Sequence, residues 1–188
     1  EKDCGQYDTV TEVMWVTGAA LFIRLADYRE VGGLDDHFFA HMEEIDLCWR
    51  LRSRGKKLVC IPQSVVYHVG GATLKKENPR KTFLNFRNNL LMLYKNLPDK
   101  ELEHVLFIRG ILDRVAALVF YLKKDRANAR AVMQARREFE DIRYSFAASR
   151  IENIMKSTDE MIPERTHFSI LMKYYLLGKK HFSQLKLF

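Results

Sequence analysis

Residues 32–50 read GGLDDHFFAHMEEIDLCWR, and the fold is inferred outward from this stretch. Two glycines and a pair of phenylalanines precede a segment with helical spacing, whose first turns carry Glu43, Glu44 and Asp46. Acidic residues at a helix start complement the positive end of the helix dipole, and arginines at positions 50, 52 and 54 suit the other end. Gly55 is a natural stop. We therefore predict a helix over residues 43–54.

Glu44 has the most informative place on this helix. Leu47, Cys48 and Leu51 form its apolar stripe, and Glu44 continues the stripe towards the helix start. A carboxylate at the inner end of an apolar stripe is partly desolvated, which raises its pKa and makes it a better base. Asp46 pairs with Arg50 at i, i+4, which favours a structural role. The alternative is that all three acids only complement the helix dipole.

Composition sets broad limits on the function. The chain has 188 residues, of which 47% are hydrophobic and 29% charged, as in a soluble globular protein. Its formal net charge of +7 favours anionic partners. The three cysteines lack CxxC spacing, which argues against a disulfide framework and a zinc knuckle. No run is long enough to span a bilayer, and the start does not read as a signal peptide.

The residues before position 80 and those from position 80 onward differ in the spacing of their apolar side chains. Buried extended segments are predicted at 13–16 and 19–23, a helical turn at 27–30, and short strands at 57–61 and 64–68. From residue 80 onward the spacing of apolar residues is helical, which predicts helices at 82–97, 102–124, 125–149 and 168–180. Pro98-Asp99 is expected to end the first of these helices and to cap the second. The fold class is therefore α+β and helix-rich.

An ordered series of motifs resembles the C-terminal half of a family 2 glycosyltransferase of the GT-A fold. The motifs are VTGAALFIR at 16–24, VGGLDDHFF at 31–39, EEIDLCWR at 43–50 and VYHVGG at 66–71. They are most similar to bacterial rhamnosyltransferase-like enzymes of surface polysaccharide assembly. The resemblance implies that residues 1–78 are the acceptor-side part of the GT-A domain, with short strands and the acid-bearing helix, and that residues 79–188 are an α-helical extension.

The resemblance also implies roles for single residues. Family members carry Glu-Asp where this chain has Glu43-Glu44, and the second acid takes the proton from the acceptor hydroxyl. Glu44 is thus the expected base, with Glu43 and Asp46 as the alternatives. His68 matches a histidine that helps to bind a divalent metal, Mg²⁺ or Mn²⁺, or the donor diphosphate.

Further residues are expected to contact the substrates. Trp15, Gly18 and Ala19 match positions that line the donor and acceptor subsites. Lys75 and Lys76 lie in a glycine-rich, basic loop that either closes over the diphosphate or is an ordinary solvated loop. Arg80, together with Arg87 and Lys95 on the same predicted helix, either reaches phosphates or belongs to a solvated face.

The donor half of the family pattern is missing, since no Asp-x-Asp lies upstream of Trp15. We expect the chain to be the C-terminal part of a longer inverting enzyme and to be inactive alone. The implied partners are a nucleotide-sugar donor and a saccharide or polyprenyl-diphosphate-linked acceptor. Exposed strand edges leave room for a homodimer.

The basic helical tail suggests a location. Residues 102–124 are amphipathic and are followed by a dense series of basic residues, which suits the anionic cytoplasmic face of the inner membrane. The alternative is that the apolar stripe packs on the core or on another tail. A competing function is a non-catalytic assembly module that binds a membrane or a partner. Nucleic-acid binding is not expected, because no aromatic platform accompanies the charge.

Overall fold

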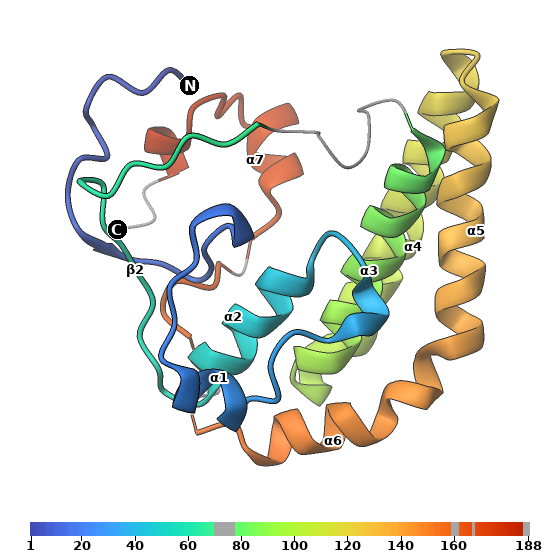
Figure 1. Ribbon diagram of the computed structural model, residues 1–188. Helices are drawn as coiled ribbons and strands as arrows, with labels where there is room; N and C mark the ends of the chain where they lie inside the picture. The colour runs from blue at the N-terminus through green and yellow to red at the C-terminus, as the bar shows by residue number, and fades with distance from the viewer. Residues whose placement is uncertain (70–77, 159–161, 167, 186–188) are drawn as a thin grey trace.

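Helices make up most of the computed structural model, which describes residues 1–69, 78–158, 162–166 and 168–185 (Figure 1), and this agrees with the predicted helix-rich α+β class. The helices are α1 (Leu25–Glu30), α2 (Glu43–Ser53), α3 (Pro79–Asn96), α4 (Asp99–Leu122), α5 (Arg126–Ile142), α6 (Ala147–Met155) and α7 (Ile170–Tyr175). Within the described ranges, the sheet consists of β1 (Thr11–Glu12) paired antiparallel with β2 (Val59–Cys60). Short 3₁₀ turns lie at Gly18–Ala20, Asp36–Phe38, Arg143–Phe146 and Phe182–Leu185.

The long helices α3, α4 and α5 run side by side and form a bundle (Figure 1). The acid-bearing helix α2 packs against α3, and α6 lies across the direction of α5. The helix α2 begins at Glu43 as predicted, and Gly55 beyond its end has a φ of +75°, a conformation that glycine adopts without strain. The prediction of an acid-bearing helix ending before Gly55 is confirmed.

Two apolar cores meet at α2. The smaller core contains Leu47, Cys48 and Leu51, which confirms the predicted buried stripe, together with Val31 and Leu58. The larger core lies in the bundle and also takes in Trp49 of α2 and Phe38 of the loop before it. Burial of apolar side chains on two faces fixes α2 against both parts of the chain. The larger core therefore crosses the boundary predicted after residue 78, although α3 does begin at Pro79.

The predicted strands are mostly wrong. Residues 13–16 and 19–23 do not form buried extended segments, since Trp15 is 46% exposed, Phe22 is 91% exposed and residues 18–20 form a 3₁₀ turn. Only Val59–Cys60 of the strand predicted at 57–61 is a strand, and residues 64–68 form none. A strand needs a partner for its backbone groups, and within the described ranges each of these segments finds one over at most two residues.

The predicted helices form, but one of them is broken and another is shorter than expected. The helix expected over residues 125–149 divides into α5, a 3₁₀ turn and α6. The break lets Phe146 enter the larger core and lets Arg150 reach Asp99 at 2.5 Å and the carbonyl of Tyr94. Asp99 therefore does not cap α4 with its side chain as predicted. The helix expected at 168–180 is shorter, at Ile170–Tyr175, and in the described ranges no helix is both long and apolar enough to cross a bilayer.

Candidate functional site

The loop that leads into α2 has an unusual backbone. Phe39, His41 and Met42 have φ values of +61°, +70° and +74°, in the left-handed region that residues with a Cβ rarely adopt. Each such residue costs about 1–3 kcal/mol, so the surrounding structure must hold the loop in place. Met42 is also the residue that directly precedes α2. The loop conformation therefore sets how the acids of α2 are presented.

The side chain of Asn88, on α3, stabilises this loop by hydrogen bonds. It is fully buried, and its Nδ2 donates to the carbonyls of Phe38 at 2.8 Å, Ala40 at 2.9 Å and His41 at 2.8 Å. Arg87 beside it donates to the carbonyl of His37 at 3.0 Å. Buried carbonyls without a donor are costly, so one side chain of α3 satisfies groups that the irregular loop leaves unpaired.

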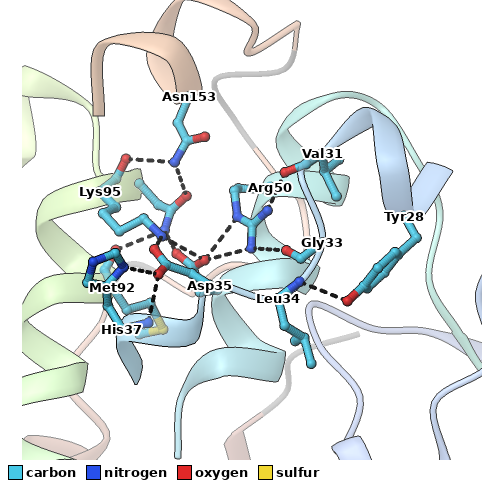
Figure 2. A network of polar contacts seen from close by, with 12 residues as sticks. Tyr28, Val31, Gly33, Leu34, Asp35, His37, Arg50, Met92, Lys95 and Asn153 are labelled. Atoms are coloured by element: carbon cyan, nitrogen blue, oxygen red, sulfur yellow. Dashed lines mark hydrogen bonds and ion pairs between the residues drawn. The ribbon is translucent and has the colours of Figure 1, made fainter. Parts of the chain in front are cut away.

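Asp46 lies at the centre of a buried network rather than in an open site. It accepts hydrogen bonds from Arg50 Nε at 2.9 Å, Lys95 Nζ at 3.0 Å and Asn96 Nδ2 at 2.7 Å, and it is fully buried. Figure 2 shows Arg50 extending from there to the backbone of Val31 and Gly33, with Lys95 beside Asp35. The predicted structural pairing of Asp46 with Arg50 is confirmed. Both oxygens of this carboxylate are therefore bound by side chains of the protein itself.

The same network fixes Asp35 at the start of the loop. Lys95 Nζ lies 2.7 Å from its Oδ2, and its Oδ1 accepts from the backbone of His37 at 3.1 Å. Burial alone would raise the pKa of Asp35, but the hydrogen bond and charge of Lys95 hold this pKa below its usual value. Lys95 is only 2% exposed. Its predicted alternative place on a solvated face is therefore wrong, and both of its nearest partners are carboxylates of the protein.

Glu44 differs from Asp46 in its surroundings. It is half-buried at the inner end of the stripe of Leu47, Cys48 and Leu51. Burial is the largest influence on the pKa of Glu44 and raises it. The charge of Glu43 also raises this pKa, while backbone hydrogen bonds from Glu44 and Ile45 and the charge of His41 oppose the rise. The direction of this shift is the one expected from the helical spacing.

Three buried polar atoms gather around the start of α2. They are Nε2 of His41, Oε2 of Glu43 and Oε2 of Glu44, and none has a hydrogen-bond partner among the described residues. Buried polar atoms in native proteins are nearly always paired. One imidazole nitrogen and two carboxylate oxygens offer both donor and acceptor capacity to a ligand hydroxyl.

The structure brings Gly18 to this place. The 3₁₀ turn Gly18–Ala20 lies against α2, and a Cβ added at Gly18 would lie 3.7 Å from Cβ of Glu44. The hydroxyl of Thr17 accepts from the backbone of Ala19 at 3.4 Å and so begins the turn. Ala19 is exposed beside Gly18, and Trp15 is partly exposed. Gly18 and Glu44, which are far apart in the sequence, thus lie side by side.

Other predicted substrate contacts are placed differently. Arg80 is exposed, with its guanidinium 5.1 Å from the ring centre of Phe39, so it lies beside the loop. Arg87 is held by Glu138 at 2.8 Å as well as by the loop. Lys75 and Lys76, in the loop predicted to close over the diphosphate, lie outside the described residues.

The described residues around His68 do not form a metal site. His68 is exposed, and the described acidic and histidine side chains whose ligand atoms converge are Asp35, Asp36 and His37, within 4.8 Å of one another. Asp35 already binds the cationic Lys95, which disfavours a second cation there. A metal at His68 therefore requires ligands other than these.

Comparison with known proteins finds relatives that are glycosyltransferases. A pre-mycofactocin glycosyltransferase of Mycobacterium tuberculosis is 31% identical over 141 residues, which cover 69% of this chain and 29% of that protein. An N-acetylglucosaminyl-diphospho-decaprenol L-rhamnosyltransferase of the same species is 38% identical over 56 residues, 30% of this chain and 18% of that protein. The chain is a homologue of bacterial glycosyltransferases.

A third glycosyltransferase relative is the rhamnosyltransferase WbbL of Escherichia coli, 36% identical over 61 residues, which are 32% of this chain and 22% of WbbL. The resemblance to rhamnosyltransferase-like enzymes is thereby confirmed. The matched region spans less than a third of each of these three relatives. No protein-family model matches the chain, and no solved structure matches it.

Sequence reasoning missed Asn88 and the buried, structural role of Lys95, both on α3. A signal for them was available, because they share one helical face with Leu84 and Leu91, at spacings of four and three residues. A polar side chain on the apolar face of a helix usually has a buried partner. His41 gave no such signal, since its place depends on the positive φ of its own loop.

Proposed function

We propose that the complete protein is an inverting glycosyltransferase in which Glu44 is the general base. The observation that carries the proposal is the carboxylate of Glu44 itself. It is half-buried, its pKa is raised by burial, and its Oε2 has no partner among the described residues. Asp46, one of the two other acids in the first turns of α2, is enclosed by Arg50, Lys95 and Asn96. This contrast supports Glu44 over Asp46.

The proposed reaction is a single displacement. Glu44 accepts the proton of an acceptor hydroxyl while that oxygen forms a bond to the anomeric carbon of the donor sugar. The bond from the anomeric carbon to the nucleoside diphosphate breaks, and the leaving group takes the bonding electrons. One carboxylate is sufficient, because no covalent intermediate forms. The raised pKa of Glu44 makes it a stronger base than an ordinary glutamate.

The names of the relatives support the chemical class of the proposed substrates and not a particular sugar. The donor is a nucleotide sugar, and the acceptor is a saccharide or a polyprenyl-diphosphate-linked sugar. One relative is named for transfer of L-rhamnose to N-acetylglucosaminyl-diphospho-decaprenol, which is an acceptor of the second kind. Gly18, which lies against Glu44, and the exposed Ala19 and Trp15 are the proposed sugar contacts. Arg80 is a proposed phosphate contact beside Phe39.

A divalent cation, Mg²⁺ or Mn²⁺, remains a proposal for the complete protein. Its chemistry would be to neutralise the diphosphate leaving group. His68 is the proposed ligand from this chain. Because the described residues do not complete a metal site around it, no step of the reaction is assigned to the metal here.

The proposed location is the cytoplasmic face of the inner membrane, where a polyprenyl-linked acceptor is anchored. A homodimer is compatible with this location. The alternative function, a non-catalytic module that binds a membrane or a partner, is favoured by the wide exposed apolar stripe of α4. The two functions differ in whether Glu44 matters for sugar transfer.

The deciding experiment compares the full-length protein with its Glu44→Gln variant on a panel of nucleotide sugars with Mg²⁺ or Mn²⁺. We expect sugar transfer to fall by about 10²–10⁴-fold, because proton transfer in the transition state is lost, while donor binding is retained. Glu43→Gln removes the same charge one residue away and is expected to retain most activity. Equal activity of wild type and Glu44→Gln would move the base to another residue, and no transfer from any donor would favour the assembly module.

This 188-residue chain by itself is predicted to be inactive. Turnover by the isolated chain would contradict that prediction without affecting the assignment of Glu44.

A further inference from the structure

One face of α4 is apolar, exposed and continuous. Its residues repeat at helical spacing over four turns, and the exposed Arg114 lies at one edge of the stripe. They are Phe107, Ile108, Ile111, Val115, Leu118, Val119 and Leu122, which are between 38% and 71% exposed. A contiguous apolar surface of this kind is uncommon on a soluble protein without a partner.

This stripe is not a misplaced part of the core. The opposite face of α4 packs on α5 through Leu106, Gly110 and Ala117, and Figure 1 shows the two helices side by side. Between them Asp113 is buried, with Arg109 at 2.9 Å and Arg136 at 2.9 Å. The ion pair of Asp113 with Arg136 of α5 fixes the rotation of α4, since turning α4 would break this buried pair. The apolar stripe therefore faces outward in the folded bundle.

A basic groove adjoins the stripe. It lies between α4 and α5, has a volume of about 1000 Å³, and shares Leu118 and Tyr121 with α4. On α5 it is lined by Arg126, Arg130 and Arg137, which are exposed and lie on one face of the helix.

Two acids line the same groove. Glu138 is already paired with Arg87 at 2.8 Å, so Asp141 is the acid that opposes the three arginines. The groove is thus cationic overall and apolar along one wall.

The chemistry of this surface selects one occupant. A second copy of the chain would bring one row of arginines towards another on a protein that already carries a net charge of +7. A free phosphate would bind the arginines and leave the apolar stripe in water. An anionic lipid surface matches both parts, because its interfacial region accepts apolar side chains and its headgroups carry the opposite charge.

We propose that α4 and α5 form a lipid-binding face, in which the apolar stripe of α4 enters the interfacial region of a bilayer and the arginines of the groove bind anionic headgroups. This inference deepens the proposed membrane location and rests on it, but it does not depend on catalysis by Glu44. The groove would hold the long axis of α4 parallel to the membrane plane.

Co-sedimentation of the chain with vesicles tests the proposal. Binding is expected to vesicles of phosphatidylcholine with phosphatidylglycerol, to weaken at high salt, and to be much weaker with phosphatidylcholine alone. Replacing Arg126, Arg130 and Arg137 by Gln is expected to lower the partition coefficient about a hundredfold. The matched control replaces Lys2, Arg24 and Arg29 by Gln, which removes the same charge from exposed sites elsewhere. If both triple variants lose binding equally, net charge alone is responsible and the proposal fails.

A separate substitution tests the apolar stripe of α4. Leu118→Glu is expected to reduce vesicle binding at least about tenfold, because a charge replaces a side chain that enters the interface, whereas Val65→Glu places the same charge on an exposed site outside the bundle and is expected to leave binding unchanged. Circular dichroism establishes that both variants are folded. A concentration-dependent dimer that Leu118→Glu dissociates would instead make a second copy the occupant. Unchanged vesicle binding by Leu118→Glu would also overturn the proposal.

Discussion

The loop that precedes α2 and the bundle of α3, α4 and α5 are stabilised in different ways. The bundle buries a continuous set of apolar side chains, and the spacing of those residues is enough to specify it. The loop over residues 35–42 instead has three residues with positive φ, and its carbonyls are satisfied by Asn88 and Arg87 of α3. The irregular segment that presents Glu44 therefore depends on polar side chains supplied by the regular one.

This difference suggests a division of tasks. Helix α3 carries the side chains that hold the loop, whereas the polar atoms left without partners lie in the strained loop, at His41, and in the first turn of α2, at Glu43 and Glu44. Strain stored beside a functional site persists only where the surroundings hold it. Removing the supports on α2 and α3 should thus affect the two regions unequally, and that is what the substitutions below measure.

The largest expected effect is at Asp46. Asp46→Ala removes the carboxylate that pairs with the buried cations Arg50 and Lys95. Because a buried charge without its partner is costly, we expect a loss of about 3 kcal/mol in the free energy of unfolding. Urea denaturation followed by circular dichroism measures it. Glu43→Ala removes an acid from the same helix, and its expected cost is below about 1 kcal/mol. Similar losses for the two variants would mean that Asp46 acts only through the helix dipole.

A somewhat smaller effect is expected at Asn88. Asn88→Ala removes the donor for the carbonyls of Phe38, Ala40 and His41, so we expect a loss of about 2–3 kcal/mol. Hydrogen exchange should increase in the loop more than in the bundle. Asn85→Ala is the matched control, because the side chain of Asn85 bonds only to a carbonyl of its own helix. Uniform deprotection of loop and bundle would show that Asn88 stabilises the core rather than the loop.

The same division explains what the sequence predicts well. Helices α2, α3 and α4 were predicted closely, because local spacing, turn residues and burial favour the same structure there. The pKa direction of Glu44 also followed from its place in the apolar stripe. The strands were overpredicted, since β-branched and aromatic residues such as Val65 and Tyr67 favour strands only where a neighbouring strand pairs with them. The contact of Asn88 with the loop links residues about fifty positions apart, and no local pattern encodes it.

A positive φ also occurs in the bundle, where it is free of functional demands. Lys124, in the turn between α4 and α5, has a φ of +63°. Lys124→Gly is expected to stabilise the fold by about 0.5–1 kcal/mol, because glycine adopts this conformation without steric cost. Lys123→Gly next to it, at a φ of −76°, is expected to destabilise instead. Thermal unfolding of the two variants gives the sign, and a loss of stability with Lys124→Gly would mean that its side chain outweighs the strain.

The smallest expected effect is the contribution of Glu44 to the pH dependence of protein stability. This effect distinguishes a carboxylate that is destabilised by burial from one that is stabilised by hydrogen bonds. Burial raises the pKa of Glu44, so its contribution to stability is fully present below the usual value of 4.5 and is lost as pH rises through the raised pKa. Glu44→Gln should therefore stabilise the fold at neutral pH, with the gain vanishing below pH 4.5.

Glu12 gives the opposite sign. Its hydrogen bond from Lys57, at 2.6 Å, lowers the pKa of Glu12, so its contribution is present above the usual value and is lost as pH falls through the lowered pKa. Glu12→Gln should thus weaken the fold slightly at neutral pH and have no effect in acid. Urea midpoints for both variants across this pH range provide the measurement. If Glu44→Gln were to follow Glu12→Gln, the carboxylate of Glu44 would be stabilised where it lies, and a residue already satisfied by the protein would be a poor base for an incoming hydroxyl.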